Sequence, residues 1–263
     1  LLSGMLGDSP VSVEEIDSGQ SLLVAGPPMT GKYQLLFQLL GEAAERGIVI
    51  TTGDPAEDVR AEFVDAADCA PADVGVVDCV SKQRGSSVSD DDFTRYVSSP
   101  KDVTEIGMKF TDQFERFREY DDQVGVGLHS LSELLVYLDA EDVYKFTRVL
   151  TTQAESEGWF TVATINASMH DQQTLHTMYE PFDTVIDTRE GDGRRELRVR
   201  DGRGPASVGR EPIHRGVYIS DVCEFTHARR RTLVSGSRRL DRADHHRRRT
   251  GVPLGAPPAG VRR

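Results

Sequence analysis

The sequence predicts an α/β fold with a mainly parallel, twisted sheet and helices on both of its faces. Short apolar runs alternate along the chain with segments whose apolar residues recur at helical spacing, as in residues 21–25 followed by 35–43. Between these two segments lies a glycine-rich turn of the form Gly-x-x-x-x-Gly-Lys, at Gly26, Gly31 and Lys32. A strand, such a turn and a helix in direct succession are typical of an α/β domain that binds phosphate groups.

The later elements continue this alternation. Further apolar strands are expected at residues 47–52, 74–80, 124–128, 160–165, 182–188 and 196–200. Helices are expected at residues 55–67, 103–120 and 131–152, and the polar, Ser/Asp-rich residues 81–99 predict a surface loop. Repeated strand-helix-strand units favour a parallel sheet, because parallel neighbours need a crossover connection.

The turn after the first strand predicts a nucleotide site. Its glycines let the backbone fold around an anion, the N–H groups of the helix N-terminus point at the phosphates, and the lysine adds a positive charge. The competing interpretation is an ordinary Gly/Pro turn that caps a helix. The predicted nucleotide-binding residues are Gly26, Pro27, Pro28, Met29, Thr30, Gly31, Lys32 and Tyr33.

Tyr33 departs from the usual pattern. The residue after the lysine is normally Ser or Thr, whose hydroxyl is a ligand of the Mg²⁺ that bridges the phosphates. The phenol of Tyr33 lies at the end of a rigid ring and cannot take that place without a rebuilt loop. The loop thus predicts ATP as the cofactor, whereas Tyr33 argues against Mg²⁺, and no metal ligand is assigned.

Length and composition indicate one domain followed by a tail. We expect the domain at residues 1–225 of the 263 and the tail at 226–263. The sequence has neither an apolar run near 18 residues nor a charged and apolar leader, so a cytoplasmic protein without a membrane partner is expected. Its three cysteines form no CxxC pair, which favours buried, reduced thiols.

Charge separates the two parts of the chain. Residues 226–263 contain 11 Arg and two acidic residues, which leaves 20 basic and 41 acidic residues in 1–225. So acidic a surface is tolerated when salt screens its repulsion, which suggests the cytoplasm of a halophile. The Arg/Gly/Pro-rich tail predicts disorder. It is either a basic arm for nucleic acid or the product of a shifted reading frame, without a selected function.

Four segments together resemble the RecA-like ATPases, particularly the KaiC-like branch and its divergent archaeal members. They are the loop 26–32, the strand and turn 48–58, the strand 124–132, and the late pair of strands 182–187 and 196–200. The resemblance covers about residues 5–220, and the order and spacing of the segments carry it. It implies a RecA-like P-loop NTPase domain, ATP as ligand and a homo-oligomer, with an unknown protein partner.

The resemblance also shows what this chain lacks. His129 stands where the family has a strand-terminal Asp that holds the water shell of Mg²⁺, and imidazole suits this hard cation poorly. Where the family has acids that activate the attacking water, this chain has Gly53 and Asp54, so Asp54 is the predicted catalytic residue. His129 is either packed at the strand end or in contact with phosphate. Arg200 and Arg203 resemble a basic pair that reaches a neighbouring subunit, or form a solvated hairpin end.

Two functions from different classes follow. The first is an ATP-binding, weakly hydrolysing ATPase in regulation, signalling or recombination, which Lys32 and Asp54 favour. The second is a non-hydrolysing pseudo-ATPase that serves as a regulatory or scaffold module, which Tyr33 and His129 favour.

Overall fold

The structure, a computed structural model, describes residues 18–120, 123–191 and 194–201. The strands in this part are β1 (Ser21–Gly26), β2 (Arg46–Thr51), β3 (Val74–Asp78), β4 (Thr94–Tyr96), β5 (Val124–His129), β6 (Phe160–Asn166), β7 (Thr184–Gly191) and β8 (Arg194–Asp201). The helices are α1 (Lys32–Ala43), α2 (Ala56–Ala67), α3 (Val103–Phe117), α4 (Leu131–Tyr137), α5 (Ala140–Ser156) and α6 (Gln172–Tyr179), with short 3₁₀ turns at Pro71–Asp73 and Ala167–Met169.

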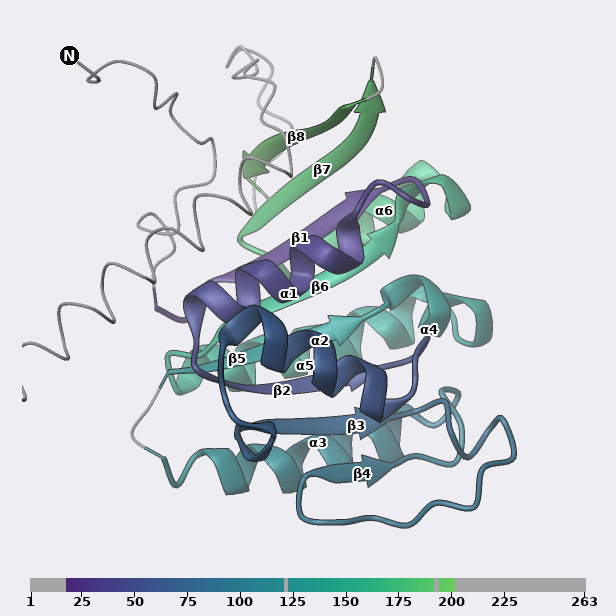
Figure 1. Cartoon of the computed structure of the whole chain (residues 1–263). Helices are drawn as coiled ribbons and strands as arrows, with labels where there is room; N and C mark the ends of the chain where they lie inside the picture. Colours follow the sequence, from purple (N-terminus) through teal and green to yellow (C-terminus); the bar gives the residue numbers. More distant parts are fainter. Residues whose placement is uncertain (1–17, 121–122, 192–193, 202–263) are drawn as a thin grey trace, which may run out of the picture. The chain divides into compact units, whose positions relative to one another are not determined.

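The strands form one sheet in the order β4-β3-β2-β5-β6-β1-β7-β8. Every neighbouring pair is parallel except β7 and β8, which form an antiparallel hairpin at one edge. Helices α1 and α2 lie side by side on one face, and α3 and α5 cover the other (Figure 1). The predicted fold class, an α/β domain with a mainly parallel sheet and helices on both faces, is confirmed.

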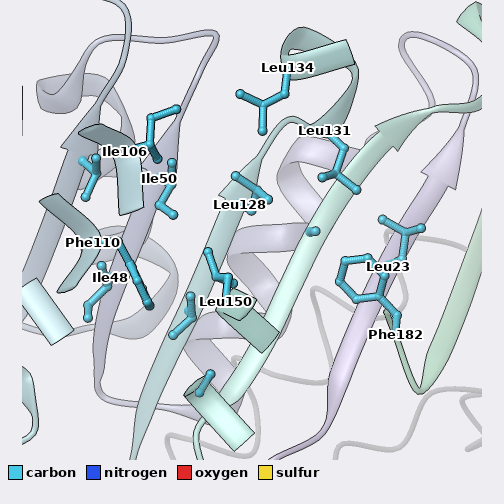
Figure 2. Packing of buried hydrophobic residues seen from close by; sticks show 14 of the residues in the cluster. Leu23, Ile48, Ile50, Ile106, Phe110, Leu128, Leu131, Leu134, Leu150 and Phe182 are labelled. Carbon is cyan, nitrogen blue, oxygen red and sulfur yellow. The ribbon is translucent and has the colours of Figure 1, made fainter. Parts of the chain in front are cut away.

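Apolar side chains of the central strands fill both sides of the sheet. On the face covered by α3, Ile106 and Phe110 pack beside Ile48 and Ile50 of β2 (Figure 2). The apolar stripe of α3 is therefore core, as period 3.6 requires of a helix that packs on a sheet. On the opposite face, a Cβ at Gly125 would meet Leu40 of α1, so the strand and that helix approach closely there.

A buried carboxylate fixes the start of α2. Asp78, at the end of β3, has no exposed surface, and its oxygens accept hydrogen bonds from the N–H groups of Ala56, Val80 and Ser81 and from the hydroxyl of Ser81, at 2.7 to 2.9 Å. A buried carboxylate is tolerated when donors satisfy it. Asp78 therefore ties the β3 turn to the helix that follows β2.

Two expected elements were wrong in part. Residues 131–152 do not form a single helix, because α4 ends before Leu138, whose backbone is extended, and Asp139 caps the start of α5 by accepting from Asp142 N at 2.9 Å. The expected loop 81–99 contains β4, a three-residue strand that pairs with β3. Thr94 begins this strand, and its hydroxyl accepts a hydrogen bond from Arg60 at 2.7 Å.

The described cysteines carry free thiols. Cys79 lies in the core, where burial raises the pKa of its thiol and keeps it protonated. No helix in the described part of the chain is both long and apolar enough to cross a membrane. Arg203, Cys223 and the predicted tail lie outside the described residues.

Candidate functional site

The turn between β1 and α1 requires both glycines of the predicted motif. A Cβ at Gly26 would overlap oxygens of Thr188 on the neighbouring strand β7. Gly31 has a φ of 80°, a backbone conformation that glycine adopts without strain. Met29 also has a positive φ, 62°, so the chain reverses sharply over these residues. Close packing on one side and backbone geometry on the other thus fix the shape of the turn.

Thr30 anchors the turn to the sheet. Its side chain is buried, and its hydroxyl donates to the Pro27 carbonyl at 2.9 Å and lies 2.6 Å from the hydroxyl of Thr188. The hydroxyl of Thr188 in turn lies 3.3 Å from the carbonyl of Ala25, so the two threonines link the turn to β1 and β7. The Thr30 side chain therefore points into the protein, and its contacts hold the turn against β7.

The N-terminus of α1 is open to an anion. Its cap residue, Gly31, has no side chain, and the first turn contains no acidic residue. The first N–H groups of a helix have no partner within the helix, and the helix dipole places positive charge there. Lys32 adds its ammonium group, which donates to the Pro27 carbonyl, and burial lowers its pKa. A negative ligand beside Lys32 would raise this pKa again, because it stabilises the charged ammonium group.

A cleft of about 450 Å³ lies beside this helix end. Residues of the first turn of α1 line it together with His129, Asn166 and residues that start α4. His129 and Asn166 are the last residues of β5 and β6; in the sheet β6 pairs with β1, and β5 pairs with β6. The cleft is therefore at the carboxyl ends of three parallel strands, where open α/β sheets bind ligands.

The structure places the predicted nucleotide-binding residues in two groups. The residues that line the cleft are Met29, Gly31, Lys32 and Tyr33. The residues that form the turn outside this lining are Gly26, Pro27, Pro28 and Thr30.

Tyr33 packs through its ring. It meets Phe37 with ring centroids 4.8 Å apart and His129 with ring centroids 4.3 Å apart, both edge to face. Burial raises the pKa of Tyr33, and the carboxylates of Asp54, Glu62 and Asp58 raise it further, so its phenol stays protonated. The ring thus joins α1 to the end of β5.

His129 is a buried neutral imidazole at this junction. Its side chain is 16% exposed, and its Nδ1 has no hydrogen-bond partner and lies 4.0 Å from a carboxylate oxygen of Asp54. Burial lowers the pKa of His129 to about 4; Asp54 opposes this shift and Lys32 adds to it. At neutral pH the ring therefore supplies no positive charge to the cleft.

The turn after β2 brings Asp54 close to His129. Thr52 holds the two strand ends together, because its N–H and hydroxyl donate to the His129 carbonyl at 2.6 and 2.9 Å. Thr51 bonds to the backbone of Asp54 at 2.7 and 3.2 Å. The Asp54 side chain is 47% exposed and does not belong to the cleft lining. The predicted catalytic residue thus lies beside His129 and outside the cleft lining.

These side chains do not fit the Mg²⁺ that a RecA-like site implies. Mg²⁺ prefers carboxylate and water oxygens in near-octahedral geometry. At the two expected ligand positions stand the rings of Tyr33 and His129, packed on each other. One carboxylate, that of Glu133 in the first turn of α4, lines the cleft, and no group of three or more His, Cys, Asp or Glu side chains suited to a metal ion occurs among the described residues.

Sequence reasoning missed several polar residues of the cleft. The buried hydroxyl of Ser132 accepts from the N–H of Asn166 at 2.8 Å and lies 2.9 Å from Nε2 of His170. Burial lowers the pKa of His170, which leaves its ring neutral, so Ser132 can donate to it. The position of Ser132 just after a strand was a usable signal, but no local pattern pairs residues 38 positions apart.

Arg200 is engaged within its own chain. Its guanidinium lies 2.8 and 3.0 Å from the two carboxylate oxygens of Asp187 on the neighbouring strand β7, and its carbon lies 4.3 Å from the ring centroid of Tyr179. This paired geometry agrees with neither expectation in full, because the side chain is not simply solvated and already has a carboxylate partner.

Comparisons with solved structures give the fold. The uncharacterised protein PH0321 from Pyrococcus horikoshii, solved in complex with an unknown peptide, matches over 71% of this chain and 84% of its own, with 11% identity and a TM-score of 0.53. The KaiC-like protein PH0186 from Pyrococcus horikoshii OT3 matches over 76% of this chain and 84% of its own, with 17% identity and a TM-score of 0.48. The match to PH0321 shows a shared fold.

A comparison with curated protein sequences finds no match. One family model matches residues 19–188, which hold the loop, the cleft and strands β1 to β6. Because this match covers more than half of the 263 residues, the chain belongs to DUF7504, a family of unknown function.

Proposed function

We propose that this chain is an ATP-binding protein of the RecA/KaiC-like type with weak or impaired Mg²⁺-dependent hydrolysis. The observation that carries the proposal is the cleft beside the N-terminus of α1, which the rigid turn and Lys32 border. Backbone N–H groups, the helix dipole and an ammonium group all favour the phosphates of a nucleotide at this place.

Hydrolysis is the part of the function that these residues support least. Phosphoryl transfer depends on a positioned water and on charge stabilisation, mostly by Mg²⁺. Asp54 is the candidate for orienting water, but it lies beside His129 and outside the cleft lining. We therefore expect turnover far below that of a nucleotide-binding ATPase with both metal contacts.

A non-hydrolysing pseudo-ATPase, acting as a regulatory or scaffold module, is the second candidate. The observation that favours it is the packing of Tyr33 between Phe37 and His129. This packing stabilises the junction of α1 and β5 where a hydrolysing enzyme would hold its metal. Such a module would use bound ATP as a structural ligand or dispense with it.

The wider role extends the same proposal. The acidic composition of residues 1–225 suits a cytoplasm rich in salt, and the resemblance to ring-forming relatives suggests a homo-oligomer. Regulation, signalling and recombination are the proposed settings, with a protein partner of unknown identity. The basic residues 226–263, outside the described part, add nucleic acid as an alternative partner.

Binding and turnover of ATP in molar KCl, measured together, test the proposal. Lys32→Ala is the key variant, and Lys101→Ala is its control, because the ammonium of Lys101 lies at the surface over the ring of Tyr137. Turnover that is present and disappears only in Lys32→Ala would exclude the pseudo-ATPase. Absence of ATP affinity in the folded wild type would exclude the ATP-binding proposal and leave the scaffold.

A further inference from the structure

The cleft beside the N-terminus of α1 suits phosphate groups, but its side chains do not suit the divalent metal ion that usually accompanies them. A nucleoside triphosphate carries several negative charges, and in related folds a divalent cation is the largest positive charge beside them. Here the cleft offers Lys32 and the open N-terminus of α1 to the phosphates. Its lining holds neutral hydroxyl and amide oxygens but only one carboxylate, that of Glu133, whereas Mg²⁺ is usually held by carboxylates and water.

Aromatic packing occupies the junction where metal ligands would stand. The Tyr33 ring is held from two sides, 4.8 Å from Phe37 and 4.3 Å from His129 by ring centroids. Moving it outward to free space for a hydrated ion would break both contacts. The three carboxylates that raise the pKa of Tyr33 belong to α2 and the turn before it.

His129 does not replace a metal ligand in this arrangement. Its Nδ1 is buried against the turn that contains Gly53, 3.5 Å from where a Cβ would lie on that glycine. The ring can offer the cleft only a neutral donor or acceptor, because burial lowers its pKa; of the charged groups that face it, Asp54 opposes this shift and Lys32 adds to it. Imidazole is in any case a poor ligand for Mg²⁺.

We propose that this chain binds the triphosphate of a nucleotide without a divalent cation. The inference rests on the proposed ATP-binding function and specifies the ionic form of the ligand. Lys32 and the N–H groups of α1 hold the phosphates directly, and monovalent cations of a salt-rich solution screen the remaining charge. The metal-free nucleotide carries more negative charge than its Mg²⁺ complex, so Lys32 and the N–H groups of α1 attract it at least as strongly.

The direct test is the affinity of the full chain for ATP in molar KCl, measured by calorimetry with excess EDTA and again with excess Mg²⁺. We expect the two dissociation constants to agree within about threefold, with the EDTA value the lower of the two if they differ. Affinity that requires Mg²⁺ would overturn the inference while leaving the ATP-binding function intact. Absence of binding in both solutions would instead overturn the proposed function on which the inference rests.

Three variants sharpen the result. Tyr33→Phe keeps the ring and removes the hydroxyl, so it should bind ATP with the same indifference to Mg²⁺. Tyr33→Ser combined with His129→Asp restores a hydroxyl and a carboxylate, and this double variant should lose about tenfold or more in affinity when Mg²⁺ is withdrawn. Glu133→Gln removes the carboxylate that lines the cleft, so it should leave the ratio of the EDTA and Mg²⁺ dissociation constants at the wild-type value, whatever its effect on the affinity itself.

The same variants give outcomes that would contradict the inference. A Mg²⁺ requirement in the wild type that Glu133→Gln or Tyr33→Phe abolishes would identify the ligand that we have excluded. If the double variant folds by its thermal transition and still ignores Mg²⁺, then the two rings are not the reason for metal independence. The comparison of EDTA and Mg²⁺ in the wild type depends on no variant and decides the matter if the double variant fails to fold.

Discussion

The buried imidazole of His129 predicts a specific loss of stability in mild acid. Burial lowers its pKa from 6.5 to about 4 in the folded protein, so the unfolded chain binds the proton more readily between these values. Stability is then fully present above pH 6.5 and is lost as the pH falls toward 4. A shift of this size corresponds to about 3 kcal/mol, since one pKa unit is worth about 1.4 kcal/mol.

His129→Phe isolates this effect. The variant keeps a ring against Tyr33 and removes the titratable nitrogens, and it sacrifices little at Nδ1, which has no hydrogen-bond partner. Urea unfolding in molar KCl at pH 7 and at pH 4 gives the free energy of unfolding of both proteins. In the difference between wild type and variant, the pH effects of the carboxylates that both proteins contain cancel. Relative to the variant, the wild type should lose about 3 kcal/mol between the two pH values. A relative loss below about 0.5 kcal/mol would show that the ring is not held neutral by burial.

Three further predictions follow from single contacts. Lys32→Ala should weaken ATP binding about 10- to 150-fold, because a hydrogen bond to a charged group contributes about 1.5–3 kcal/mol, and Lys101→Ala should bind as the wild type does. Equal affinities of the two variants in a fluorescence titration would show that Lys32 does not contact the nucleotide. Asp78→Ala strands several buried donors and should lower the free energy of unfolding by about 3 kcal/mol or more, whereas Asp112→Ala, whose side chain is 56% exposed, should stay within about 0.5 kcal/mol; similar urea midpoints for the two would contradict this. Asp54→Asn should reduce any turnover about 100-fold at unchanged ATP affinity, and unaltered phosphate release would exclude Asp54 as the water-orienting group.

The strands and most helices were predictable because local patterns determine them. Apolar runs such as residues 21–25 can be buried on both faces only in a sheet covered by helices, so the fold class follows from their repetition. The division of 131–152 was missed because its apolar spacing continues across Leu138, while the break depends on one extended residue and on the cap at Asp139. A three-residue strand such as β4 is too short to show a period of two.

The local motif of the candidate site was predictable from the sequence, but the contacts between residues that are distant in the sequence were not. The spacing of Gly26, Gly31 and Lys32 predicts the loop, because each position has a local backbone or charge requirement. The reason for Gly26 lies in Thr188, which is 162 residues away, and no pattern links the two. Tyr33 and His129 were each recognised as departures, but that their rings pack on each other is a tertiary fact.

The central claim is that residues 26–32 hold the phosphates of a nucleotide, and a crystal structure of the protein grown with ATP and EDTA tests it most directly. We predict a triphosphate in the cleft, against the N–H groups that begin α1, with the ammonium of Lys32 moved from the Pro27 carbonyl to a phosphate oxygen. The ring of Tyr33 should still pack on His129. A nucleotide bound elsewhere, or a cleft filled by water at saturating ATP, would contradict the account.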